Sequence, residues 1–423
     1  MRTEWAGLLQ SLPRSSFAAT GARVDDLLRS GEDVINLCQG NPDLPTPAHI
    51  VEALRTEVLD PVTHRYPPFS GLLELKNAIS AWYARHHGVR LDPETEVAIL
   101  FGAKAGLVEI SQCFLNPGDV CLMPDPAFPD YWAGVILARA RMHPLPLRRS
   151  NGFLPEYDCL DPAVCERAKL MFLNYPNNPT SATAPREFYE DTVRFAARHN
   201  VIVASDFAYG ALGLDGQLPV SFLETEGAKE VGVEFISLSK TFNMAGWRIG
   251  AVVGHRDVIA AINLLQEHYY VSLPPFIQRA AIAALTGPQD AVRQLAKTYE
   301  RRRDVLLDGL EGSAWSLDTP RSVFAWLPIP PGRGGSVAFA DELLSRAHVA
   351  VAPGRWFGEH GEGYVRVSLL APEDRLAEVA RRMADLPIPA TTTPHHAPQH
   401  DPHHAPQHDP HHSPNHSTKG TLS

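Results

Sequence analysis

The strongest constraint on the fold of this chain is a repeated alternation of short apolar runs with longer segments of helical pattern. The apolar runs lie at 96–100, 119–125, 169–175, 200–206, 234–239 and 248–254, with helical segments such as 104–114 and 186–199 between them. This alternation predicts an α/β fold. Runs such as 169–173 and 201–204 lack strict polar alternation, which favours a mostly parallel sheet covered by helices on both faces. We therefore expect function in the loops after the carboxyl ends of the strands.

Beyond about residue 290 the pattern changes. A long charged helical segment at 298–312 precedes mixed strand-like and helical segments, which predict a smaller α+β domain. The segment through about residue 44 is expected to pack against this domain. The predicted division is an N-terminal segment, a large domain, a small domain and a tail, at 1–45, 46–289, 290–388 and 389–423.

The last part of the chain is an eight-residue repeat rich in histidine and proline. Nine of the 19 histidines lie between His395 and His416. Frequent proline and few apolar residues predict that 389–423 is disordered. Histidines at this density could chelate a divalent metal, but such tails more often have no catalytic role, and we assign no metal to the functional site.

Composition excludes several classes of partner. The formal net charge is −10, from 38 basic and 48 acidic residues without a basic stripe, so nucleic acid is not expected. The five cysteines form no C-x-x-C pair, which fits a reducing compartment. The first residues lack a signal-peptide core and no apolar run approaches about 20 residues, so we expect a cytoplasmic protein without a membrane partner.

The most informative motif surrounds Lys240, at the end of an apolar run. Ser237 and Ser239 precede it and Arg248 follows eight residues later. Burial lowers the pKa of an amine and makes it a nucleophile able to form a Schiff base with an aldehyde cofactor, while an arginine can hold the phosphate of that cofactor. The alternative is an ordinary surface lysine at the end of a strand.

A second motif, Ser205-Asp206-Phe-Ala-Tyr209, also follows an apolar run. A carboxylate here could pair with the ring nitrogen of a pyridine cofactor, so that the ring accepts electrons from a carbanion. Tyr209 could donate a hydrogen bond to the phenolic oxygen of the ring. The alternative is that Asp206 merely caps the next helix.

Two further motifs occupy strand ends. Asn178 lies in the proline-containing turn 174–180, and Ala103 and Lys104 lie in a small-residue turn before a helix, where backbone N–H groups could bind phosphate. Each turn alone is weak evidence for a binding site, because such turns often bind nothing. Together, the four motifs converge on one small molecule carrying a phosphate, an aldehyde and a basic ring.

On these motifs the chain, over roughly residues 15 to 386, resembles the fold-type I, class I/II pyridoxal-phosphate aminotransferases. The resemblance implies pyridoxal 5′-phosphate as cofactor, amino acids and 2-oxo acids as substrates, and ping-pong transfer of an amino group. It also implies the role of each matching residue. Lys240 forms the Schiff base, Asp206 pairs with the ring nitrogen, Tyr209 and Asn178 contact the phenolic oxygen, and the phosphate is held by Ala103, Lys104, Ser237, Ser239 and Arg248.

Other positions follow from the same resemblance. Phe128 matches the aromatic residue that stacks on the cofactor, and Arg366 matches the arginine that binds the substrate carboxylate, with Gly40 and Asn178 nearby. Tyr66 matches a tyrosine supplied to the neighbouring subunit, which implies a homodimer with shared active sites. The family usually has glycine where Ser181 stands, and serine there costs strain if the position requires positive φ.

Several runs, including GNPDLPTPAHIVEAL and FGEHGEGYVRVSLL, look most like the methionine-salvage branch, whose members aminate 2-oxo-4-methylthiobutanoate. Branches that act on alanine, aromatic amino acids or diaminopimelate share most of these motifs. A β-lyase or cyclase of the same fold is one alternative function. A non-catalytic cofactor-binding sensor is another, although no basic DNA-binding segment accompanies the motifs.

Overall fold

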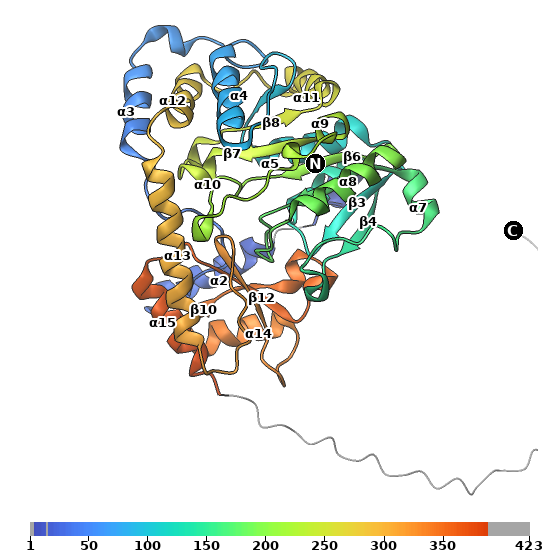
Figure 1. Ribbon diagram of the computed structural model, residues 1–423. Helices are drawn as coiled ribbons and strands as arrows, with labels where there is room; N and C mark the ends of the chain where they lie inside the picture. The colour runs from blue at the N-terminus through green and yellow to red at the C-terminus, as the bar shows by residue number, and fades with distance from the viewer. Residues whose placement is uncertain (1–3, 14–15, 388–423) are drawn as a thin grey trace, which may run out of the picture. The chain divides into compact units, whose positions relative to one another are not determined.

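A seven-stranded sheet forms the centre of the computed structural model, which describes residues 4–13 and 16–387 (Figure 1). The strand order is β2-β8-β7-β6-β5-β3-β4. Only β8 runs antiparallel to its neighbours, so the predicted mostly parallel sheet is confirmed. The strands are β2 (Val97–Leu100), β3 (Val120–Asp125), β4 (Arg141–Pro146), β5 (Ala168–Asn174), β6 (Ile202–Asp206), β7 (Gly232–Ser237) and β8 (Gly250–Gly254).

Burial explains why apolar runs in the sequence predicted six of these strands. Every residue of β2, β3, β7 and β8 is buried, so their sequences are almost continuously apolar. No such apolar run marks β4, which pairs only with β3 at the sheet edge and is largely exposed. Its two prolines, Pro144 and Pro146, are tolerated there because an edge strand needs fewer backbone donors.

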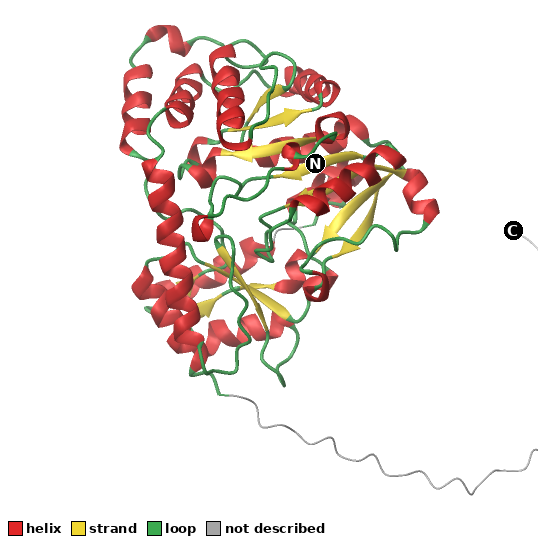
Figure 2. Cartoon of the chain, viewed as in Figure 1, coloured by secondary structure: helices red, strands yellow, loops and turns green. Residues whose placement is uncertain are grey.

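Helices cover both faces of this sheet (Figure 2). On one face, α5, α6 and α11 pack their apolar side chains against one another and the strands. On the other face, α4, α8 and α12 belong to a separate and larger apolar cluster. The helices of this part are α3 (Ala48–Glu57), α4 (Leu73–His87), α5 (Ala103–Phe114), α6 (Asp130–Leu137), α7 (Pro162–Arg167), α8 (Arg186–His199), α9 (Ala228–Val231), α10 (Leu238–Thr241), α11 (Arg256–Tyr269) and α12 (Pro275–Thr286).

A second apolar cluster surrounds an antiparallel sheet of order β11-β12-β9. The long helix α13 packs along α15 beside this sheet. Helix α14 continues into a π-helical segment, Leu343–Ala347. The elements are α13 (Asp290–Leu310), β9 (Phe324–Pro328), α14 (Ser336–Glu342), β10 (Val349–Ala350), β11 (Ala352–Pro353), β12 (Tyr364–Ser368) and α15 (Glu373–Ala384).

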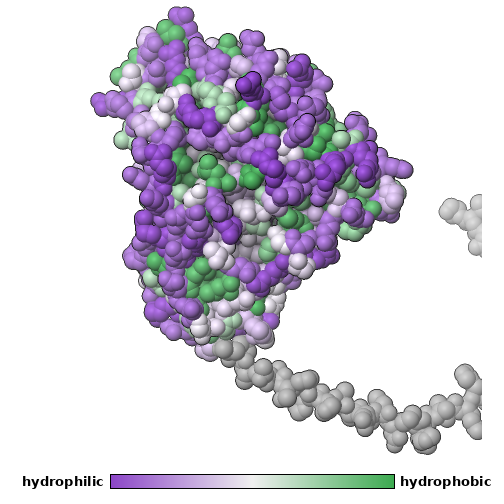
Figure 3. Space-filling view, in the orientation of Figure 1, coloured by the Kyte–Doolittle hydropathy of each residue, from purple (hydrophilic) through white to green (hydrophobic). Residues whose placement is uncertain are grey.

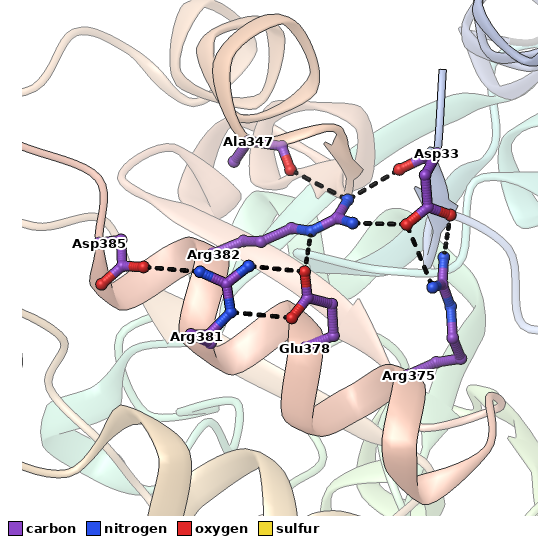
Figure 4. A network of polar contacts seen from close by, with 7 residues as sticks. All are labelled: Asp33, Ala347, Arg375, Glu378, Arg381, Arg382 and Asp385. Carbon is purple, nitrogen blue, oxygen red and sulfur yellow. Dashed lines mark hydrogen bonds and ion pairs between the residues drawn. The ribbon is translucent and has the colours of Figure 1, made fainter. Parts of the chain in front are cut away.

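The N-terminal elements are α1 (Gly7–Gln10), α2 (Ser16–Arg29) and β1 (Ile35–Asn36). Strand β1 pairs in parallel with β10, and Val24 of α2 shares an apolar cluster with Leu344. Asp33 strengthens this attachment, because its carboxylate accepts hydrogen bonds from Arg375 and Arg382 of α15 (Figure 4). These bonds lower the pKa of Asp33 to about 2.

The surface seen in Figure 3 is mainly hydrophilic with small apolar groups among the polar residues. Within the described part of the chain, no helix is both long and apolar enough to cross a membrane. The predicted tail at 389–423 lies outside the described residues, and the predicted four-part division of the chain stays a prediction.

Candidate active site

Parallel strands β5, β6 and β7 lie side by side and bring three of the predicted motifs to one edge of the sheet. They end at Asn174, Asp206 and Ser237, and all three side chains line one cavity of about 840 Å³. Arg366, from the antiparallel sheet, lines the same cavity. The predicted placement of the site at the carboxyl ends of the strands is therefore seen in the structure.

Lys240 lies in the one-turn helix α10, directly after β7. Ser237 caps this turn by accepting a hydrogen bond from the Ser239 backbone N–H. The Lys240 ammonium donates to the backbone oxygen of Gly40, which connects it to the N-terminal segment. Burial, with repulsion from Arg366 and Arg248, lowers the pKa of Lys240 to about 8. The lowered pKa therefore increases the fraction of this amine that is neutral near neutral pH.

Asp206 is buried at the end of β6, and its carboxylate is not simply a helix cap. Its Oδ2 accepts a hydrogen bond of 2.6 Å from the Tyr131 hydroxyl, and its Oδ1 accepts from the Ala208 backbone N–H at 3.2 Å. Burial raises the pKa of Asp206 to about 6, while the Tyr131 hydrogen bond opposes that rise. A cationic partner in the cavity would stabilise the ionised form further.

Tyr131 is a functional candidate that the sequence analysis missed. It lies in α6, fully buried, and its ring stacks on Phe172 at a centroid distance of 4.8 Å. Phe128 packs edge-on against the same ring at 5.6 Å. A tyrosine three residues after the predicted stacking residue looks like an ordinary core aromatic, so no sequence signal connected it with Asp206, 75 positions away.

Arg366 lies in the middle of β12 and is 3 % exposed. Its Nη1 donates to the Asn178 side-chain oxygen at 2.6 Å, and its Nη2 donates to the Cys38 backbone oxygen at 2.5 Å. These bonds join the antiparallel sheet, the asparagine turn and the N-terminal segment. They bring three predicted substrate-side positions together, because Gly40 follows Cys38 by two residues.

The Arg366 guanidinium has no carboxylate partner among the described residues. It lies over the rings of Phe324 and Phe357, at 4.2 and 4.7 Å from the ring centroids, and its Nε is buried without a hydrogen-bond partner. Burial lowers the pKa of Arg366 to about 10. A buried guanidinium held by neutral groups is suited to bind an anion that enters the cavity.

A second group of residues suited to bind an anion also lines the cavity. Ala103 and Lys104 begin α5, and Arg248 approaches the preceding Gly102 so closely that a Cβ there would lie 2.5 Å from the guanidinium. Lys104 is more than half exposed and pairs with Asp130 at 2.9 Å. Backbone N–H groups of α5 and the Arg248 side chain together could hold a phosphate.

The remaining predicted residues divide into those at the cavity and one that lies apart. Tyr209 and Phe128 line the cavity. Tyr66 does not, and it is 88 % exposed. Ser181 does have positive φ, at 63°, so the strain expected for serine in place of glycine is present. Also missed by the sequence analysis were apolar residues that line the cavity, among them Leu12, Phe17, Trp132 and Trp356.

Fold and site together define a class of protein: an α/β enzyme with a partly buried amine, a buried carboxylate and two guanidinium groups lining one cavity. Comparison with known proteins makes this assignment specific. The sequence profile of the family "Aminotransferase class I and II" matches residues 32–383. The chain belongs to this family.

The most similar relatives are aminotransferases. L-glutamine--4-(methylsulfanyl)-2-oxobutanoate aminotransferase of Bacillus subtilis is 53 % identical over 387 residues, which cover 91 % of this chain and 97 % of the relative. LL-diaminopimelate aminotransferase of Desulforudis audaxviator is 44 % identical over an alignment that covers 89 % of this chain and 96 % of the relative. The substrate-bound structure of BacF from Bacillus subtilis superposes with a TM-score of 0.87 at 45 % identity, covering 91 % of this chain and 98 % of that one.

These comparisons confirm the sequence-based interpretation of fold and activity. The protein is a fold-type I aminotransferase that transfers an amino group between amino and oxo acids. The alternative functions, a lyase or cyclase and a non-catalytic sensor, are not favoured.

Proposed function

We propose that this enzyme uses pyridoxal 5′-phosphate and forms methionine from 2-oxo-4-methylthiobutanoate. The observation that carries the proposal is the pair of groups in one cavity: Lys240, with its pKa lowered to about 8, and Arg366, buried without a carboxylate partner among the described residues. An amine and an unpaired guanidinium facing the same space suit a substrate that has a carboxylate next to its reacting carbon.

The residues present fit the cofactor. Arg248 and the start of α5 would hold its phosphate, with Ala103, Lys104, Ser237 and Ser239 around it. Asp206 would pair with the ring nitrogen, Tyr209 and Asn178 would contact the phenolic oxygen, and Phe128 would stack on the ring. Bound there, the cofactor supplies an aldehyde for the amine and a ring that takes up an electron pair.

The protein's own groups then have distinct tasks. Arg366 orients the substrate by binding its α-carboxylate, with Gly40 and Asn178 beside it. The neutral amine of Lys240 would accept the proton from the substrate Cα and deliver it to the carbon that carried the cofactor aldehyde, which a lowered pKa permits near neutral pH. The buried carboxylate of Asp206 keeps negative charge beside the ring nitrogen throughout.

The methionine substrate is supported by the walls of the cavity. Among described residues, the cationic side chains that line it are Lys104, Lys240, Arg248 and Arg366. Lys104 is paired with Asp130, and the other three have tasks at the cofactor or the α-carboxylate. No cation is then left for a second carboxylate, whereas the apolar lining residues suit a thioether side chain.

We further propose a cytoplasmic homodimer in which Tyr66 contacts the phosphate of the neighbouring site. Its neighbours in sequence include Leu59, Val62 and Phe69, which are 76 %, 54 % and 54 % exposed. Such apolar exposure favours burial against another subunit. All five cysteines are free, which agrees with a reducing compartment.

The test is a panel of amino donors and oxo acids given to the purified holoenzyme, with the products identified by mass spectrometry. We expect methionine from 2-oxo-4-methylthiobutanoate at a higher kcat/KM than any product from oxo acids with a second carboxylate. A clear preference for dicarboxylic oxo acids would contradict the methionine proposal. Sedimentation analysis of the same preparation should give the mass of a dimer.

A further inference from the structure

The glycine-rich segment Gly354–Gly361 connects β11 to β12, the strand that carries Arg366. Its fold depends on close backbone approaches. A Cβ at Gly354 would lie 1.8 Å from the Gly361 backbone oxygen, and Gly358 has φ of +136°. This segment therefore has one compact shape, made of two short 3-10 turns, that can be placed as a unit against its surroundings.

Asp125 holds this unit against the central sheet. It is the last residue of β3, and its carboxylate accepts hydrogen bonds from the backbone N–H groups of Glu359 and His360 at 3.2 and 3.1 Å. His360 Nδ1 lies 2.9 Å from the same carboxylate. A Cβ at Gly358 would lie only 2.0 Å from Asp125 Oδ1, so the glycine is needed for the carboxylate to reach these donors.

One backbone hydrogen bond continues this contact toward the cavity. The Ala127 N–H donates to the Phe357 backbone oxygen at 2.7 Å. The Phe357 ring lies under the Arg366 guanidinium, and the adjacent Trp356 lines the cavity. Phe17 packs edge-on against Trp356 at 5.1 Å. The Asp125 contact is thus connected, through Ala127 and Phe357, to the wall of the cavity beside Arg366.

We propose that Asp125 is a positioning residue for substrate binding: it fixes the Gly354–Gly361 segment so that Trp356 and Phe357 form the wall against which the substrate side chain lies. The inference rests on the proposed binding of the substrate carboxylate by Arg366. Asp125 itself does not line the cavity, so it acts through the segment and not on the reacting atoms. A carboxylate is required because one residue must accept from two N–H groups and an imidazole.

The experiment measures the first half-reaction of the holoenzyme with L-methionine and with L-alanine, following the cofactor absorbance by stopped flow. Asp125→Ala and His360→Ala remove the contact from its two sides, and Asp125→Asn retains one acceptor oxygen. Glu359→Gln is the matched control, because this neighbouring carboxylate loses the same charge but is 79 % exposed and bonds only to Arg355.

For Asp125→Ala we expect the half-saturating methionine concentration to rise on the order of tenfold, that of alanine to rise less, and the maximal rates to change by less than about threefold. His360→Ala and Asp125→Asn should give smaller changes of the same kind. Cofactor affinity of the apoprotein should be unchanged, and Glu359→Gln should behave as the wild type. The preference for methionine over alanine is the decisive readout, since a loss of folded protein would lower both activities equally.

The inference is overturned if methionine and alanine are affected by the same factor, if only the maximal rate falls, or if the cofactor is lost. If Asp125→Ala fails to fold, the same criteria apply to Asp125→Asn and His360→Ala. Arg366→Lys, measured in parallel, separates the two proposals. A normal Arg366→Lys enzyme refutes the carboxylate role, whereas a weakened one with normal Asp125 variants refutes only the positioning role.

Discussion

The two sides of the cavity differ in how their residues are held in place. On the side of the central sheet, Asn174, Asp206 and Ser237 end three adjacent parallel strands, so a single hydrogen-bonded sheet sets their spacing. On the opposite side, Arg366 belongs to another sheet and reaches its partners only through side-chain and segment contacts.

This difference teaches how catalysis and substrate choice can be separated in one fold. Asp206 and Ser237, which are assigned to the cofactor, lie in paired strands of one sheet, and this backbone pairing changes little when a side chain is replaced. The groups assigned to the substrate depend on contacts between segments, such as Arg366 with Asn178 and Asp125 with His360. We therefore expect changes on the sheet side to affect the chemical step and changes on the other side to affect substrate binding.

The largest effect is expected from Lys240→Ala, which should lower kcat on the order of 10⁴-fold, because Lys104, the other amine that lines the cavity among the described residues, is paired with Asp130. The lysine-dependent visible absorbance should disappear while phosphate-dependent cofactor binding persists. Steady-state kinetics and absorbance spectra check both points. An undiminished transamination rate would remove Lys240 from the centre of the mechanism.

A smaller effect is expected on the substrate side from Arg366→Lys. Lysine keeps the charge but loses the second parallel hydrogen bond. The transition state should therefore be less stable by about 2 kcal/mol, which lowers kcat/KM roughly 30-fold for every α-amino acid. Both half-reactions should suffer alike since both substrates carry the same carboxylate. Cofactor affinity, measured by titration of the apoprotein, should not change. Loss of the cofactor instead would show that the two sides are not independent.

On the sheet side, Tyr131→Phe should change the pH dependence of cofactor binding. The Tyr131 hydrogen bond stabilises ionised Asp206, so its removal should raise the Asp206 pKa above its value of about 6. Cofactor binding that requires the carboxylate is complete above this pKa and is lost as the pH falls through it. The midpoint should therefore shift to higher pH in fluorescence titrations of the apoprotein. An unchanged midpoint would mean that Tyr131 only fills space.

The smallest effect is expected from a truncation after residue 388, which leaves every residue of both sides of the cavity in place. The cut keeps the carbonyl groups of Leu386 and Pro387, which accept hydrogen bonds from Arg333. The removed repeat offers almost no apolar surface to bury. Melting temperature and kcat should stay within experimental error of the full chain. A marked fall in either would show that the repeat docks on the enzyme.

The sequence by itself determined the central sheet and the residues at its strand ends. Buried parallel strands must be apolar throughout, so β5, β6 and β7 are visible as uninterrupted runs. Because such strands end at a common edge, the sequence alone predicts that Asn178, Asp206 and Lys240 lie near one another. The exposed edge strand β4 escaped prediction because its burial, and hence its composition, has no regular pattern.

Only the tertiary structure decided the contacts that connect distant segments. Tyr131 with Asp206, Asp125 with His360 and Arg366 with Cys38 are separated by 75, 235 and 328 positions. Each pair is a hydrogen bond between side chains or backbone groups whose own surroundings in sequence are ordinary. Local patterns report burial and secondary structure, whereas such a bond depends on how two independently formed sheets and the N-terminal segment are packed together.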